Sequence, residues 1–379
     1  MQTELVKCIG RASAGPRGFE KIASRSISVA ASGTNCHNTA QWLLFTPVAA
    51  VVGMARIGDY KLGQAIGLGT VGTVYRAKDR KSGQPVAIKI LLPQVSKDEN
   101  IVRRFRREMS VLEKLDHPNI VRYHGDGIHN GQLYYAMELV EFGTVKDELE
   151  ARGRISWRKA CRYGLQICSA LQHAHNHSII HRDLKPSNLF LSGDGQIKLG
   201  DFGIARDTAS ADLTDAGMTV GTYAYMAPEQ IRGGLNVSDR TDLYALGCLM
   251  FEMIVGRKPF RGNNFAVIFD QHFHSPPPRA SDQVQGVPAE LDQILLQLMA
   301  KNPDDRPFNA RYVQGYLQNL LESHPQTGGA PGDDLMVRFP GAVESPGSGR
   351  DVSWAVLVGI MLLVAGVISA AVILTNVML

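Results

Sequence analysis

The first patterned part of the chain alternates apolar and polar positions with a period of two. The runs "YKLGQAIG" (60–67), "TVYRAKD" (73–79) and "PVAIKILL" (85–92) are rich in β-branched residues, and short segments that contain glycine separate them. Runs of this period between glycine-containing turns are typical of antiparallel strands. We therefore expect a small antiparallel sheet here.

After the third run the apolar residues follow the period of a helix. In residues 96–115 one helical face collects four of them: Ile101, Phe105, Met109 and Leu112. Ser96 and Glu99 have the spacing of a capping box at the start of this helix. From Trp157 onward the pattern is mostly helical, and the segment 238–256 is apolar on nearly every side. That segment predicts a buried helix that ends at Gly256.

Two lobes follow from this change of period. We expect a small β-rich N-lobe at about residues 57–140 and a larger helical C-lobe at about residues 141–322. Strands followed by helices, without regular alternation, indicate an α+β fold.

The chain closes with an uncharged apolar run of 21 residues, 354–374. At about 1.5 Å per residue it spans the ~30 Å hydrocarbon core of a bilayer. A Gly- and Pro-rich linker (323–350) precedes it and a short tail (375–379) follows, so a buried core helix would have little to pack against. We expect one transmembrane helix, with almost nothing beyond it on the far side.

The N-terminal residues 1–56 show no sustained period and contain only two acidic residues, Glu4 and Glu20. A disordered extension, or sequence upstream of a translation start at Met54, is the favoured interpretation. A basic, acid-poor segment also resembles an organelle transit peptide. The apolar run that Pro47 interrupts is too short to span a membrane.

Charge and cysteine content exclude several classes of protein. The net charge of +4 is not gathered into a Lys/Arg block, which argues against nucleic-acid binding. Five irregularly spaced cysteines without a C-x-x-C pair predict neither structural disulfides nor a zinc site, and they suit a reducing compartment.

A glycine-rich loop adds the first candidate chemistry. Gly67, Gly69 and Gly72 form G-x-G-x-x-G, and the loop continues into a strand rather than a helix. Backbone N–H groups of such a hairpin can approach phosphate oxygens without interference from side chains. Alone, the loop is also compatible with a simple hairpin, and Lys89 and Glu108 are compatible with surface charges.

Longer motifs identify the family that the chain resembles. "HRDLKPSN" (181–188), "DFG" (201–203) and "APE" (227–229) follow the glycine loop and "VAIK" (86–89) in the order of the eukaryotic-type (Hanks-type) protein kinases. The resemblance covers about residues 60–322 and is nearest in appearance to bacterial membrane-anchored serine/threonine kinases. It implies the two-lobed protein kinase fold.

The resemblance also implies roles for single residues. Lys89 matches the lysine that holds the α- and β-phosphates of ATP, Glu108 its helix partner, Asp183 the catalytic base, and Lys185 a counter-charge near the γ-phosphate. Asn188 and Asp201 match the two Mg²⁺ ligands, and Thr222 lies in the segment that cradles the acceptor. The matching nucleotide-binding positions are Ile66, Gly67, Leu68, Gly69, Thr70, Val71, Gly72, Thr73, Val74, Ala87, Lys89, Met137, Glu138 and Val140.

Several further matches imply scaffold roles. Asp242 resembles a buried aspartate that ties the catalytic loop to a central helix, and Arg306 resembles the partner of Glu229. His117 fits a turn position. For a group of histidines at one helix end we expect solvation rather than a metal site: His173, His175 and His177.

Regulation by phosphorylation is implied by Arg182, which directly precedes the catalytic aspartate and can pair with a phosphate on the following loop. Thr214 and Thr219 are the candidate autophosphorylation sites, followed by Thr208 and Ser210. Many bacterial relatives carry T-x-T here, whereas this chain continues from Thr214 with Asp215 and Ala216, which puts a two-phosphate pattern in doubt.

The leading interpretation is a membrane-tethered serine/threonine kinase that uses ATP with Mg²⁺, for which Mn²⁺ is a possible substitute. Its partners would be protein substrates, the membrane and, transiently, a second copy for trans-autophosphorylation. The kinase domain would be cytoplasmic, since it needs MgATP. A pseudokinase scaffold is the alternative from another class, although Lys89, Asp183, Asn188 and Asp201 are all present. A small-molecule phosphotransferase is disfavoured by "GTYAYMAPE" (221–229).

Overall fold

The structure is a computed structural model that describes residues 56–69, 72–97, 99–202, 223–233 and 237–325. All of these belong to the unit Met54–Leu379, one of the two into which the chain divides. Apart from residue 56 and residues 323–325, the predicted N-terminal extension, linker, transmembrane helix and tail lie outside the described residues. Among the described helices, none has the length and apolar content that a bilayer crossing requires.

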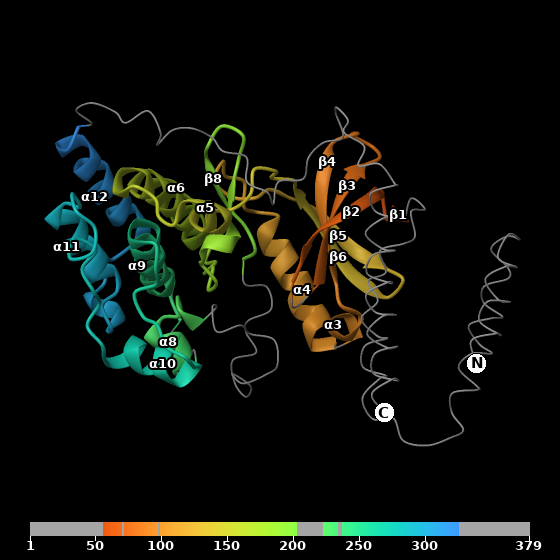
Figure 1. Cartoon of the computed structure of the whole chain (residues 1–379). Coiled ribbons are helices and arrows are strands. Elements are labelled where there is room, and N and C mark those ends of the chain that lie inside the picture. Colours follow the sequence, from red (N-terminus) through yellow and green to blue (C-terminus); the bar gives the residue numbers. More distant parts are fainter. Residues whose placement is uncertain (1–55, 70–71, 98, 203–222, 234–236, 326–379) are drawn as a thin grey trace, which may run out of the picture. The chain divides into compact units, whose positions relative to one another are not determined.

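The N-terminal strands form one antiparallel sheet in the order β1-β2-β3-β4-β6-β5 (Figure 1). The strands are β1 (Arg56–Ile57), β2 (Tyr60–Leu68), β3 (Gly72–Asp79), β4 (Pro85–Leu91), β5 (Tyr123–His129) and β6 (Gln132–Glu138). The three period-two runs are β2, β3 and β4, so the predicted antiparallel sheet is confirmed.

Alternation along β4 and β6 separates two apolar clusters on the two faces of the sheet. One cluster contains Ile57, Ala77, Val86, Ile88, Tyr134 and Ala136. The other contains Leu91, Leu133 and Tyr135 together with Phe105 and Met109 from a helix. Since Lys89 pairs in register with Tyr135, and Ala87 with Met137, these four residues lie on the second face.

The helix beside this face differs at its start from the prediction. It is split into α3 (Pro93–Lys97) and α4 (Glu99–Leu112). Ser96 lies inside α3, where its Oγ donates to the carbonyl of Leu92 and accepts from the N–H of Leu133. The predicted capping role of Ser96 is wrong, because its hydroxyl instead joins α3 to β6.

The rest of the described chain is mainly helical. Its elements are α5 (Val145–Arg152), α6 (Trp157–Asn176), η3 (Pro186–Asn188), β7 (Leu189–Leu191), β8 (Ile197–Leu199), α8 (Pro228–Ile231), α9 (Asp239–Val255), α10 (Phe265–His274), α11 (Ala289–Leu298), η4 (Pro303–Asp305) and α12 (Ala310–Ser323). A β-rich lobe followed by a helical lobe confirms the predicted α+β kinase-like architecture.

Helix α9 is the centre of the helical lobe. It contacts α6 and α11 (Figure 1), and nearly every residue from Thr241 to Ile254 is buried. Ser238 caps its start, and Gly256, at φ 81°, ends it in the left-handed conformation. The predicted buried helix and its end are confirmed.

Candidate active site

The loop that carries the "HRD" motif is fixed to the first turn of α9. Asp242, 1% exposed, accepts the N–H of His181 on Oδ2 and the N–H of Arg182 on Oδ1, both at 2.8 Å. Arg182 has a left-handed backbone (φ 63°), a conformation that costs about 1–3 kcal/mol at a non-glycine residue. These two charge-assisted bonds offset that cost, and they give Asp242 the scaffold role that the sequence suggested.

His175 takes part in the same anchor. Its Nε2 donates to Oδ2 of Asp242 at 2.8 Å, and its side chain is only 5% exposed. The expected solvation is therefore wrong for His175. His117 accepts the N–H of Asn119 on Nδ1, as suits a turn residue. In the part of the chain that the structure describes, no cluster of His, Cys, Asp or Glu side chains has the arrangement of a metal site.

Two functional side chains of the loop, those of Lys185 and Asn188, meet at Asp183. Lys185 Nζ is 2.8 Å from Asp183 Oδ2, and Asn188 Nδ2 donates to the Asp183 carbonyl at 2.8 Å. The same amide nitrogen lies 3.3 Å from Asp183 Oδ2. The short helix η3 begins at Pro186 and brings Asn188 back to Asp183, so the carboxylate is held in one orientation and next to a cation.

A second cluster joins the sheet to the "DFG" aspartate. Lys89 Nζ lies 2.7 Å from Asp201 Oδ1, and the hydroxyl of Tyr135 donates to the same oxygen at 3.3 Å. Burial raises the pKa of Asp201, but attraction to Lys89 outweighs it and the pKa is lowered. Burial lowers the pKa of Lys89, but Tyr135 and Asp201 outweigh it and the pKa is raised. Asp201 is therefore an anion, and Lys89 a cation, at neutral pH.

The pairing of Lys89 differs from the expectation. Lys89 forms an ion pair with Asp201, and within the described residues no ion pair joins Lys89 to Glu108. Glu108 lies half-buried in α4, on the helix predicted to supply it. Asp201 also has a left-handed backbone, at φ 50°.

The end of β6, where we expect adenine to bind, is held by contacts of Glu138 with neighbouring residues. The N–H of Glu138 donates to the carbonyl of Arg122 at 2.8 Å, and the Glu138 side chain pairs with Lys198 at 3.0 Å. Since its N–H is committed, Glu138 can offer a ligand only its carbonyl oxygen on the backbone. Ala87, buried in β4, is paired in register with Met137 beside it.

The last glycine of the loop lies where no side chain fits. A Cβ on Gly72 would be 2.2 Å from the carbonyl oxygen of Ile90, so β3 and β4 approach closely only with glycine there. Gly69 N–H donates to the Gly72 carbonyl at 2.9 Å and closes the turn. Leu68 is 89% exposed. Thr70 and Val71 lie outside the described residues, as do the predicted Thr222, Thr208, Ser210, Thr214 and Thr219.

The donor set fits a divalent cation with oxygen ligands. Asn188 directs its amide nitrogen to Asp183, and its Oδ1 accepts from the hydroxyl of Ser187 at 3.4 Å while keeping a second lone pair for a cation. Asp201 is an anionic carboxylate. The N–H of Gly200, next to Asp201, donates to the Asn188 carbonyl at 3.0 Å and holds the two ligand positions together. Hard oxygen donors of this kind suit Mg²⁺ or Mn²⁺.

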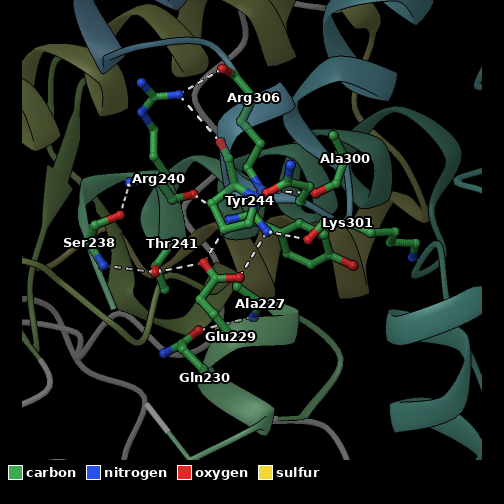
Figure 2. A network of polar contacts seen from close by, with 12 residues as sticks. Ala227, Glu229, Gln230, Ser238, Arg240, Thr241, Tyr244, Ala300, Lys301 and Arg306 are labelled. Atoms are coloured by element: carbon green, nitrogen blue, oxygen red, sulfur yellow. Dashed lines mark hydrogen bonds and ion pairs between the residues drawn. The ribbon is translucent and has the colours of Figure 1, made fainter. Parts of the chain in front are cut away.

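A buried ion pair holds the glutamate of the "APE" motif (Figure 2). Arg306 Nη1 and Nη2 donate to the two carboxylate oxygens of Glu229 at 2.7 and 2.9 Å. Thr241, in the first turn of α9, donates to Glu229 Oε1 at 2.8 Å. Burial raises the pKa of Glu229, but Arg306 outweighs it and the pKa is lowered. The expected partnership of Arg306 with Glu229 is confirmed.

Comparison with known proteins decides the family. A family model described as "Protein kinase domain" matches residues 60–316, which is more than half of the chain. This chain belongs to the protein kinase family. The predicted resemblance is confirmed. The kinase motifs identified above all lie within this matched region, although Thr70, Val71 and residues 203–222 are not among the described residues.

Two curated kinases that are similar to this chain come from bacteria. The serine/threonine-protein kinase PrkC of Bacillus subtilis is 38% identical over 273 residues, covering 72% of this chain and 42% of PrkC. PknJ of Mycobacterium tuberculosis is 39% identical over 250 residues, covering 64% of this chain and 42% of PknJ. The chain thus spans less than half of the length of either kinase. The crystallised kinase domain of M. tuberculosis PknI, a double mutant, matches with a TM-score of 0.57 and 26% identity, over 71% of this chain and 98% of that domain.

Two members of the site were not foreseen from the sequence. Tyr135 contacts Asp201 across 66 positions of the chain, and His175 contacts Asp242 across 67. The signal for Tyr135 was the period of two along β6, which places it on the same sheet face as Met137. His175 had no comparable signal, because a histidine in the last turn of a helix is usually solvated.

Proposed function

We propose that this kinase is an active serine/threonine protein kinase that transfers the γ-phosphoryl group of ATP, with Mg²⁺, to hydroxyl groups of proteins. The observation that carries the proposal is the arrangement around Asp183, whose carboxylate is oriented by Asn188 and lies 2.8 Å from the ammonium of Lys185. The similarity to PrkC and PknJ, which are serine/threonine kinases, supports the choice of acceptor.

The roles follow from what each side chain can do. Asp183 accepts the proton of the acceptor hydroxyl, and Lys185 offsets negative charge that develops beside it. Lys89 supplies a fixed cation for phosphate oxygens. Bound Mg²⁺ would neutralise charge on the phosphoryl oxygens, held by Asn188 and Asp201.

Two alternatives are weaker. A pseudokinase scaffold usually lacks a lysine, base or metal ligand, whereas this chain keeps Lys89, Asp183, Asn188 and Asp201 in connected positions. A small-molecule phosphotransferase would not need the "GTYAYMAPE" segment, and here Glu229 of that segment is held by a buried arginine.

The experiment is phosphoryl transfer by the full-length chain and by Asp183→Asn. Loss of a positioned general base typically costs 10²–10⁴-fold in rate, so we expect autophosphorylation and ADP release to fall by at least about 100-fold. Asp282→Asn, an exposed change of the same kind, is the matched control. Equal rates for wild type and Asp183→Asn would rule out the proposed enzyme.

We also propose that residues 354–374 tether the kinase to a membrane, with the kinase domain on the cytoplasmic side, and that Thr214 or Thr219 is autophosphorylated between transient pairs of chains. Asp242 fixes the backbone of Arg182, and an arginine directly before the catalytic aspartate is a residue type that pairs with such a phosphate. Membrane fractionation of the full-length chain against a chain truncated after residue 350 tests the tether. Phosphopeptide mapping tests the sites, and active protein without phosphate at either threonine would contradict the second proposal.

A further inference from the structure

A pocket on the helical lobe shares no residue with the candidate active site. It lies where the loop after α9 meets α10, has a volume of about 440 Å³, and is lined by Arg257, Pro259, Arg261, Gly262 and Gln271. The loop sequence "GRKPFRGNN" (256–264) contains three basic residues and no acidic one. Neither the phosphate chemistry nor the scaffold described above uses these residues.

The pocket is built on a fixed loop. The N–H of Arg261 donates to Gln271 Oε1 at 3.1 Å, and Gln271 Nε2 donates back to the Arg261 carbonyl at 2.6 Å. A Cβ on Gly262 would be 2.7 Å from Cγ1 of Val267, so glycine allows the loop to lie close against α10. Phe260, 2% exposed, anchors the middle of the loop. The backbone that presents both arginines therefore has a defined position.

The two arginines of the pocket have no ion pair in the described part of the chain. Arg257 and Arg261 are exposed, and within the described ranges neither forms an ion pair with a carboxylate. No acidic residue occurs between Glu252 and Asp270. Glu252 accepts a hydrogen bond from the hydroxyl of Tyr225, and Asp270 pairs with His274 at 2.8 Å. Two guanidinium groups thus line one pocket without a carboxylate partner among the residues that the structure describes. Guanidinium groups recognise carboxylates and phosphates through paired hydrogen bonds.

The position of the pocket indicates the kind of molecule that carries the anion. Helix α10 packs against α8 through a cluster that includes Tyr223, Met226 and Ile268. Tyr223 and Met226 belong to "GTYAYMAPE", the segment that faces polypeptide substrates under the proposed function. Helix α10, which lines the pocket through Gln271, therefore also packs against this segment, and a protein substrate is the occupant that we consider.

We propose that the Arg257–Arg261 pocket binds an acidic segment of the protein substrate, apart from the hydroxyl that receives the phosphate. The segment carries either clustered Asp and Glu residues or a phosphorylated residue, since both present oxyanions to the two arginines. This proposal rests on the proposed kinase function for its occupant, but binding itself requires no catalysis.

Binding to the full-length chain in mild detergent, without ATP, tests the proposal. Three fluorescein-labelled 12-residue peptides serve as probes: one with four glutamates, one with glutamines at the same positions, and one with a single phosphoserine. We expect the acidic or the phosphorylated peptide to bind, the glutamine peptide to bind at least tenfold more weakly, and Arg257→Ala/Arg261→Ala to weaken anion binding by at least about tenfold. Which of the two anionic peptides binds more tightly identifies the source of the oxyanion.

Two further double variants, and vesicles that contain anionic lipid, serve as controls. Arg279→Ala/Arg311→Ala removes the same charge from two exposed arginines away from the pocket and should leave binding unchanged. Arg257→Lys/Arg261→Lys keeps the charge but not the paired donors, and should bind with intermediate affinity. Equal loss in the two alanine pairs, or binding only to vesicles that contain anionic lipid, would overturn the proposal. Phosphoryl transfer by wild-type chain to an acceptor peptide without acidic residues is measured separately, so failure of the kinase function is distinguishable from failure of the pocket.

Discussion

Replacing Arg306 with alanine should destabilise the helical lobe far more than replacing an exposed arginine of similar geometry. The Arg306 side chain is 0% exposed and that of Glu229 is 7% exposed. Besides Glu229, Arg306 donates to the backbone carbonyls of Arg240 and Ala300, both at 2.9 Å, and of Lys301 at 3.2 Å. Arg306→Ala therefore leaves a buried carboxylate and three carbonyl oxygens without this donor.

The expected cost follows from burial. Removing one partner of a buried ion pair costs about 3–5 kcal/mol, because the remaining charge is not compensated. The exposed pair Arg122–Asp116 has a similar distance, 2.9 Å, but its side chains are 60% and 77% exposed. Arg122→Ala should cost only about 0–1 kcal/mol. Burial, rather than distance, is thus what the comparison measures.

Urea unfolding of the full-length chain, followed by circular dichroism at several pH values, is the assay. The pKa of Glu229 is lowered in the folded state, so the pair stabilises the fold above the unfolded pKa of about 4.3 and loses this effect as pH falls through the folded value. The difference between wild type and Arg306→Ala should accordingly be largest near pH 7 and shrink below about pH 4. A cost at pH 7 no greater than that of Arg122→Ala would refute the reasoning.

Three further changes test other parts of the structure. Tyr135→Phe removes a hydroxyl from the Lys89 cluster, and a lost hydrogen bond of about 1 kcal/mol should raise the KM for MgATP about fivefold, so an unchanged KM would contradict its role. Gly72→Val places a side chain against the β4 backbone and should cost about 1–3 kcal/mol, seen as a lower Tm, whereas Gly315→Ala, with open space around it, should not lower Tm. Burial lowers the pKa of His272 to about 3, so the unfolded chain binds a proton that the folded chain does not, and stability should fall by about 1 kcal/mol from pH 6 to pH 5. His272→Gln should flatten this slope if it folds, and the exposed His274→Gln should leave it intact; a wild-type slope insensitive to both would count against the buried neutral histidine.

Local pattern was enough to predict most of the fold. The three strands and the buried helix that ends at Gly256 depend on period and on one left-handed glycine, both of which are properties of short segments. Ser96 misled the prediction because a capping hydroxyl and a hydroxyl that joins α3 to β6 look the same in sequence. The choice depends on where β6 lies, and that is a tertiary contact.

In the candidate site, too, motifs predicted some contacts, whereas contacts that depend on the tertiary structure could not be predicted. Asp242, Arg306 and the residues around Asp183 were predicted by motif, and their contacts agree with the implied scaffold roles. The carboxylate partner of Lys89 could not be predicted. Asp201 and Glu108 lie on different elements, and the relative position of these elements determines which of the two reaches Lys89. Tyr135 was missed for the same reason, although the register of β4 with β6 places it opposite Lys89.

Two adjacent residues of α9 hold the two halves of the catalytic surface. Thr241 binds the carboxylate of Glu229, and Asp242 binds the backbone of the loop that contains Asp183. Consecutive Cα atoms are about 3.8 Å apart, so the loop that carries Asp183 and the helix α8 that carries Glu229 are both held by the same short segment of α9. Local opening of the first turn of α9 would release both at once, and catalytic competence should therefore disappear in a single step as denaturant is raised, rather than by gradual misalignment of its parts.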